Sequence, residues 1–203
     1  MKNLILTALL CCLAVSGYTQ TKTARTIKNL KSGIKGEITA SSRYAAFAQK
    51  AYLEGQTCIA RLFEAASRSE AIHAANHKRA LKGLGETMVY FIPDYEVKTT
   101  AENLQSAIEG ETYEVTTMYP QFINEAATEK KETATNSFTW AFETEKKHQQ
   151  FYSNALSSLK AKNVFTLPYG YAVCPICGNT FEKLKVGESC PFCYTRREMF
   201  INL

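Results

Sequence analysis

Two copies of one short motif constrain this chain more than any other feature. Glu70 with His73, and Glu145 with His148, each place a carboxylate and an imidazole three residues apart. On a helix, that spacing puts both side chains on one face. One such motif would say little, because short patterns arise by chance. The chain has only three histidines, however, and two of them fall in these motifs.

The motifs belong to an internal repeat. The sequence Ile-Lys-Gly-Glu ends at Glu37, and the similar Ile-Glu-Gly-Glu ends at Glu111. Glu37 lies 33 residues before Glu70, and Glu111 lies 34 residues before Glu145. A fixed period of this kind indicates a duplicated structural unit. Each unit therefore carries one Glu on a first helix and Glu-x-x-His on the next.

The hydrophobic pattern predicts a mainly α fold. From about residue 26 to 159, apolar residues recur every three or four positions, in segments near 26–53, 57–84, 99 onward and 131–161. Thr99 and Glu102 form a candidate capping box at the start of the third segment. A short connection joins the first two segments, and a long one containing Pro93 leads to the third. Two helical hairpins joined by a long crossover predict a ferritin-like four-helix bundle.

The four-helix prediction gives the repeated residues a chemical meaning. One Glu from each of two helices, plus Glu-x-x-His from each of the other two, is the ligand set of ferritin-like di-iron proteins. Carboxylates with one imidazole per metal suit iron or manganese, whereas structural zinc favours thiolates or more histidines. With Glu114 added, the site has five carboxylates, with a total charge of −5. The net charge of the site is then −1 when two ferrous ions are bound, and again −1 when two ferric ions and one oxide are bound. Each acid alone would also fit a solvated helix face, but their shared register would not. His77, the third histidine, is expected at the surface or beside the ligands rather than among them.

The C-terminal segment contains a second metal-binding pattern. Cys174 and Cys177 are followed, after twelve residues, by Cys190 and Cys193. Two Cys-x-x-Cys turns can bring four thiolates to one tetrahedral point, which is typical of zinc or a single iron. In an exported protein, one disulfide within each turn is the alternative. Cys58 stands apart and is expected to be a small buried apolar residue.

Several stretches together resemble the rubrerythrin family. They are GEITASSRYAAFAQKA, SEAIHA, AENLQSAIEGETYEVTTMYPQFI, ETEKKH and the four-cysteine segment, in the family's order. The resemblance extends from about residue 26 to the C-terminus. It implies a ferritin-like di-iron bundle over 21–165 and a small rubredoxin-like β/knuckle domain over 166–203. It also implies two non-haem irons in the bundle and one iron in the four-cysteine site, where zinc is the alternative.

The resemblance also implies roles for the ligands. Glu70 and Glu145 would bridge the two irons. Glu37 would hold the first iron, and Glu111 with His148 would hold the second.

Further residues match family positions with less direct roles. By the resemblance, Glu114 and His73 would alternate as ligands of the first iron when its oxidation state changes. Tyr44 and Tyr119 match tyrosines beside the site, although each is also an ordinary core aromatic. Tyr194 is a departure, because rubredoxins often have Gly at this place.

The resemblance implies a peroxidase that reduces hydrogen peroxide to water in oxidative stress defence. Electrons would arrive through the rubredoxin-like iron from an unidentified donor, either a rubredoxin-type protein or a reductase. A homodimer is expected, in which one chain's rubredoxin-like domain serves the other chain's di-iron site. One alternative is a ferroxidase or iron-storage protein that does not use the four-cysteine centre. Another is a zinc site that only stabilises the fold.

Residues 1–20 predict an export signal. Lys2 precedes an uncharged, mostly apolar run that ends near Gly17 and is too short to span a bilayer. The protein is therefore expected to be exported, in the periplasm. An uncleaved membrane anchor is an alternative, and so is a lipoprotein modified at Cys11 or Cys12. The net charge of +5 is too small and too scattered to indicate binding to nucleic acid.

Overall fold

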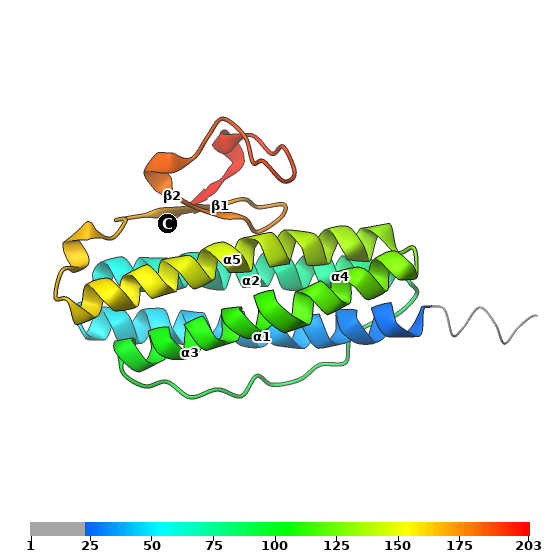
Figure 1. The fold of residues 1–203 in the computed structure, drawn as a ribbon, viewed down its shortest axis with the longest axis horizontal. Helices are drawn as coiled ribbons and strands as arrows, with labels where there is room; N and C mark the ends of the chain where they lie inside the picture. The colour runs from blue at the N-terminus through cyan, green and yellow to red at the C-terminus, as the bar shows by residue number, and fades with distance from the viewer. Residues whose placement is uncertain (1–22) are drawn as a thin grey trace, which may run out of the picture.

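The computed structural model describes residues 23–203, and the predicted export signal lies outside them. A bundle of four long helical members forms most of the described chain (Figure 1). Three members are the uninterrupted helices α1 (Ala24–Leu53), α2 (Thr57–Gly83) and α5 (Glu132–Lys160). Among residues 23–203, no helix is both long enough and apolar enough to cross a membrane.

The remaining member of the bundle contains a turn of π-helix that the sequence pattern did not predict. It consists of α3 (Thr100–Tyr113), the π segment η1 (Glu114–Met118) and α4 (Tyr119–Thr128), one directly after another. A π turn adds one residue to the helical repeat, and such turns occur frequently at functional sites. Here the turn begins at Glu114.

The connections confirm two hairpins joined by a long crossover. A tight turn at Gly55, whose φ is 73°, reverses the chain between α1 and α2. Residues 86–99 then run without helix or strand along the outside of the bundle to α3 (Figure 1). The predicted capping box is present, because Thr99 accepts a hydrogen bond from the Glu102 backbone and donates its own N–H to the Glu102 carboxylate. The bundle is therefore the predicted ferritin-like type.

Two apolar clusters fill the bundle on either side of its middle. One contains Tyr44, Phe63 and Tyr152, and the other contains Leu30 and Phe138. Along each member of the bundle, the predicted metal ligands lie between the buried residues of these two clusters. The ligands therefore lie in a polar layer with apolar side chains on both sides, which keeps bulk water away from them.

The C-terminal residues form a small sheet domain on the bundle. Its antiparallel sheet has the order β2-β1-β3, made from β1 (Tyr171–Val173), β2 (Thr180–Glu182) and β3 (Ile201–Asn202). The domain lies over α2 and α5 (Figure 1). Its own apolar cluster includes Cys174, Cys177 and Cys190, and Trp140 of α5 packs against that cluster. The predicted small β/knuckle domain is thus present.

The two halves of the repeat place equivalent phenylalanines in the core, which gives a first prediction. Phe63 and Phe138 each lie seven residues before a Glu-x-x-His motif and are fully buried. Phe63→Ala and Phe138→Ala should each lower the free energy of unfolding by about 3–5 kcal/mol, because each leaves a cavity. Phe165→Ala is the control, since Phe165 is 90% exposed. Urea denaturation of the metal-free protein measures all three. A loss for Phe165 as large as for the others would contradict the assigned core.

Candidate metal centre

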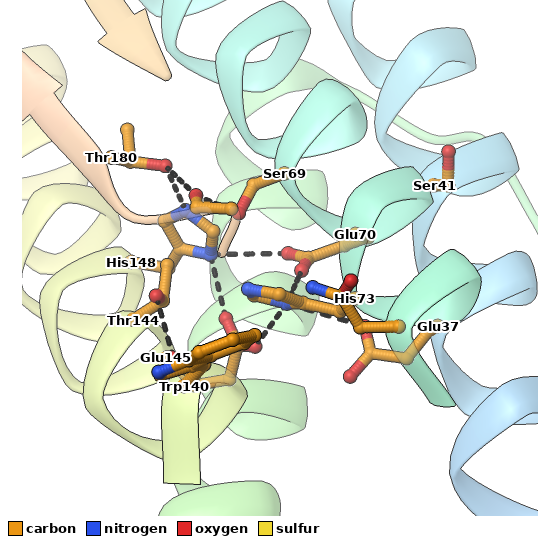
Figure 2. A network of polar contacts seen from close by, with 12 residues as sticks. Glu37, Ser41, Ser69, Glu70, His73, Trp140, Thr144, Glu145, His148 and Thr180 are labelled. Atoms are coloured by element: carbon orange, nitrogen blue, oxygen red, sulfur yellow. Dashed lines mark hydrogen bonds and ion pairs between the residues drawn. The ribbon is translucent and has the colours of Figure 1, made fainter. Parts of the chain in front are cut away.

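All four members of the bundle send ligand-type side chains to one buried point. α2 contributes Glu70 and His73, and α5 contributes Glu145 and His148 (Figure 2). Glu37 and Glu111 come from α1 and α3. The side chains form two groups whose ligand atoms lie within 4.8 Å of one another, one with Glu37, Glu70, His73 and Glu145, the other with Glu70, Glu111, Glu145 and His148. Glu70 and Glu145 belong to both groups.

The shared carboxylates are arranged symmetrically between the two imidazoles. His73 Nδ1 lies 2.9 Å from Glu70 Oε2 and 2.9 Å from Glu145 Oε1. His148 Nδ1 lies 3.0 Å from Glu70 Oε1 and 2.8 Å from Glu145 Oε2. Each carboxylate therefore offers one oxygen to each histidine. This is the arrangement that two carboxylates bridging a pair of metals require.

Apart from these contacts between the carboxylates and the two imidazoles, several of the buried atoms have no hydrogen-bond partner within residues 23–203. They are Glu37 Oε2, Glu70 Oε1, both Glu145 carboxylate oxygens and His148 Nδ1. Buried polar atoms without partners destabilise a protein, and native structures contain few of them. Carboxylate oxygens and imidazole nitrogens are also the donors that iron prefers at such sites. The donor set therefore fits a pair of iron ions.

The carboxylates of the site are not equivalent in their electrostatics. Burial, followed by repulsion from Glu145, raises the pKa of Glu70 and raises that of Glu111 well above the usual range. Burial and repulsion from Glu37 likewise raise the pKa of Glu114. In Glu37 itself, burial is outweighed by contacts with His73 and His77, so its pKa is lowered.

Both predicted tyrosines contact ligands. The Tyr44 hydroxyl donates a hydrogen bond to Glu111 Oε1 at 2.6 Å, and the Tyr119 hydroxyl donates one to Glu37 Oε1. Both tyrosine side chains are buried. Each half of the repeat thus has one tyrosine that orients one terminal carboxylate.

His77 is fully buried beside the site, so the expectation of a surface position was wrong. Its Nδ1 is 2.6 Å from Ser137 Oγ, and its Nε2 is 3.1 Å from the Tyr119 hydroxyl. The second expectation, a place beside the ligands, is the one observed. The spacing of four residues from His73 places both histidines on one helix face, which was the available signal.

Glu114 lies outside both groups of ligand atoms. It is the first residue of the π turn, and a Cβ on Gly36 would lie 3.9 Å from its Oε1. Glu114 is near enough to Glu37 and Glu145 for their charges to raise its pKa. His73, by contrast, belongs to a ligand group. This structure therefore has His73 among the ligand atoms and Glu114 beside them.

The four C-terminal cysteines form a second cluster of ligand atoms. All of the cysteines within residues 23–203 are free thiols, so neither within-turn disulfide is present. Two Sγ–Sγ contacts join the two turns, at 3.4 Å for Cys174 with Cys193 and 3.4 Å for Cys177 with Cys190. Four sulfurs gathered from two turns fit one tetrahedral metal.

Tyr194 does not disrupt the second turn. It adopts a φ of 59°, as Gly178 does in the first turn with a φ of 84°. Its backbone N–H donates to Cys190 O at 2.9 Å, and that of Gly178 donates to Cys174 O at 3.0 Å. The two turns therefore have the same hydrogen bond, although a non-glycine residue in this region is strained.

The differing carboxylates give a prediction for the metal-free protein at pH 7. Glu111→Gln should raise the melting temperature, because ionising Glu111 is unfavourable in the folded state. Glu37→Gln should lower it, because the ionised form of Glu37 is favoured there. In a chain of this size, each 1 kcal/mol change in the free energy of unfolding should shift the melting temperature by roughly 2–4 °C.

Calorimetry over a range of pH checks this prediction and its sign. The pKa of Glu111 is raised, so its ionisation destabilises the fold only above the ordinary value of 4.5. The gain from Glu111→Gln should therefore disappear as the pH falls toward 4.5. Equal effects of the two substitutions would contradict the assigned electrostatics.

Comparison with known proteins agrees with this geometry. The family model described as rubrerythrin matches residues 28–156. Rubrerythrin-2 of Clostridium acetobutylicum is 33% identical over 180 residues, which cover 88% of this chain and 97% of the relative. Nigerythrin of Nitratidesulfovibrio vulgaris is 35% identical over 190 residues, which cover 89% of this chain and 88% of the relative.

The structural comparison points to the same relatives. The structure of the mixed-valent state of nigerythrin matches with a TM-score of 0.77 and 32% identity, covering 88% of this chain and 86% of the other. The match therefore extends beyond the region of the family model. From the sequence match, the ligand geometry and the shared fold, we conclude that the chain belongs to the rubrerythrin family.

Proposed function

We propose that the protein is a non-haem di-iron peroxidase that reduces hydrogen peroxide to water in defence against oxidative stress. One observation carries the proposal: the four-cysteine centre lies directly over the helices that bear His73 and His148. An iron held by four thiolates is an electron-transfer centre, and its place beside a two-metal site supports a redox enzyme more than an iron store. The family membership supports the same activity.

The reaction sets the requirements on the site. Reduction of one hydrogen peroxide to two waters consumes two electrons and two protons. Two ferrous ions, when bound, supply those two electrons together. Glu70 and Glu145 would bridge them, while Glu37 with His73 and Glu111 with His148 would complete the two positions. The distances between the carboxylate oxygens and the imidazole nitrogens support this assignment.

The surrounding residues hold protons and exclude water. The Tyr119 hydroxyl holds Glu37 in place, and the Tyr44 hydroxyl holds Glu111. The apolar clusters on either side of the ligands limit the access of bulk water. Glu114, whose pKa is raised, can keep a proton at its carboxyl close to the site. Its place at the start of the π turn supports an exchange with His73 as a ligand of the first position.

Electrons must be returned after each turnover. An iron held by Cys174, Cys177, Cys190 and Cys193 would carry one electron at a time, so two such transfers would be needed for each peroxide. The four-cysteine domain covers the site of its own chain, so this transfer does not require a second subunit, although the resemblance supports a homodimer. The electron donor would be a rubredoxin-type protein or a reductase. If the N-terminal segment directs export, the donor must act in the periplasm.

Peroxide turnover by Cys190→Ser tests the proposal. The fully reduced variant should still consume about one peroxide per di-iron site, because both electrons come from the bundle. Its sustained turnover with an artificial reductant that feeds the four-cysteine centre should fall at least tenfold, because that centre is lost. Cys58→Ser is the control, since Cys58 belongs to neither metal cluster.

A different outcome would favour the ferroxidase. In that case the protein would oxidise added Fe(II) with dioxygen and accumulate ferric iron, and Cys190→Ser would have no effect. Sustained peroxide reduction by Cys190→Ser at the wild-type rate would contradict the electron-transfer role.

A further inference from the structure

Both histidines of the site have the same orientation. Each turns Nδ1 toward the carboxylates, so each Nε2 lies on the side of the ring that faces the C-terminal domain. The His148 Nε2 atom lies 2.9 Å from the hydroxyl of Thr180, the first residue of β2 (Figure 2). Thr180 is completely buried. The four-cysteine domain therefore contacts a candidate ligand through a single hydroxyl group.

The hydrogen bonds around Thr180 allow its hydroxyl to accept a proton from His148. The Thr180 hydroxyl donates to the carbonyl oxygen of Gly178 at 3.3 Å, so its lone pairs remain available as acceptors. When Nδ1 of His148 binds a metal, the proton of the neutral imidazole is on Nε2, which then donates it to the Thr180 hydroxyl. A neutral imidazole has one N–H, so Nδ1 is left with a free lone pair directed at the carboxylates. That tautomer is the one that binds a metal through Nδ1.

His73 has no corresponding contact. Its buried Nε2 has no hydrogen-bond partner within residues 23–203 and lies against the backbone of Gly178. A Cβ on Gly178 would lie only 2.4 Å from that nitrogen. The domain thus packs closely on both imidazoles but hydrogen-bonds only one. The two metal positions should differ in how firmly their histidine is held.

Further polar contacts hold the first cysteine turn in place on the bundle. Ser69 Oγ donates to Gly178 O at 2.6 Å, and Asn76 Nδ2 donates to Ile176 O at 2.8 Å. On α5, Lys147 Nζ donates to Asn179 Oδ1 at 2.5 Å. These bonds come from the helices that carry the two histidines. The position of the Thr180 hydroxyl is therefore fixed relative to His148 by both helices.

We propose that Thr180 is a positioning residue through which the four-cysteine domain completes the second metal position. Its hydroxyl keeps His148 in the tautomer that binds metal, so docking of the domain raises the metal affinity at Glu111 and His148. The first position, at Glu37 and His73, gains much less. Loss of a hydrogen-bond partner of a metal-binding histidine typically changes metal affinity by about 10–100-fold. The proposal rests on the metal site and does not depend on peroxide as the substrate.

Anaerobic titration of the metal-free bundle sites in the full chain with Co(II) tests the proposal, because visible absorption reports each bound ion. Thr180→Val should lower the affinity for one of the two Co(II) ions by about 10–100-fold and leave the affinity for the other within about threefold of wild type. Thr180→Ser should restore the affinity, because it keeps the hydroxyl. Thr166→Val is the control, since the Thr166 hydroxyl contacts only Ser158 Oγ and Asn163 O, both away from the ligands.

Two further measurements separate positioning from misfolding. NMR of the Co(II)-loaded protein should show a slowly exchanging His148 N–H in wild type and in Thr180→Ser, but a rapidly exchanging one in Thr180→Val. Ser69→Ala loosens the same turn without removing Thr180, and should also weaken only one ion. The visible absorption of an iron-loaded four-cysteine centre reports whether the domain is folded in each variant.

The outcomes distinguish this proposal from the proposed function. Unchanged cobalt affinity in Thr180→Val, or an equal loss at both positions, would overturn the role of Thr180. Neither result would decide whether the protein reduces peroxide. Conversely, a protein that did not reduce peroxide could still show the selective loss of one ion.

Discussion

The concentration of buried acid is the constraint on which the rest of the structure depends. Glu37, Glu70, Glu111 and Glu145 meet in the middle of the bundle, with apolar side chains above and below them. Carboxylates so placed must bind protons or cations, because their charges repel one another where water cannot screen them. Burial, together with this repulsion, raises the pKa of Glu111 well above its usual range. A pair of metal ions removes it, so metal binding and stability of the bundle should be linked.

The other features of the site follow from this constraint. Each terminal carboxylate is held by a tyrosine hydroxyl, and the two central carboxylates each face both imidazoles. The π turn begins at Glu114 and places a further acid at the margin of the site. The four-cysteine domain closes the remaining side and contacts both histidines. The structure thus joins the carboxylate and histidine cluster to the four-cysteine cluster through residues 176–180.

Much of this arrangement could be predicted from the sequence, because it depends on helix periodicity. The spacing of the apolar residues and the lengths of the two connections were sufficient to predict the bundle. The register of Glu37 with Glu70, and of Glu111 with Glu145, was sufficient to predict the cluster of ligands. The π turn could not be predicted, because it has no distinct local pattern. The contact of Thr180 with the α5 histidine depends on how the C-terminal domain packs on the bundle, which spacing along the chain does not determine. The spacing of four residues from His73 placed the third histidine on the ligand face of its helix, but its full burial depends on contacts with other helices that the sequence alone does not determine.

Mössbauer spectroscopy of the protein loaded with ⁵⁷Fe tests the central claim most directly, because it separates iron by ligand type and by magnetic coupling. In the oxidised protein, we expect two coupled high-spin ferric ions with oxygen and nitrogen ligands for every tetrahedral iron with thiolate ligands. Substitution of Glu70 or Glu145 should abolish the coupled pair and leave the thiolate iron unchanged. A spectrum with only thiolate iron, or with bundle iron that shows no coupling, would contradict the assignment of a two-metal site.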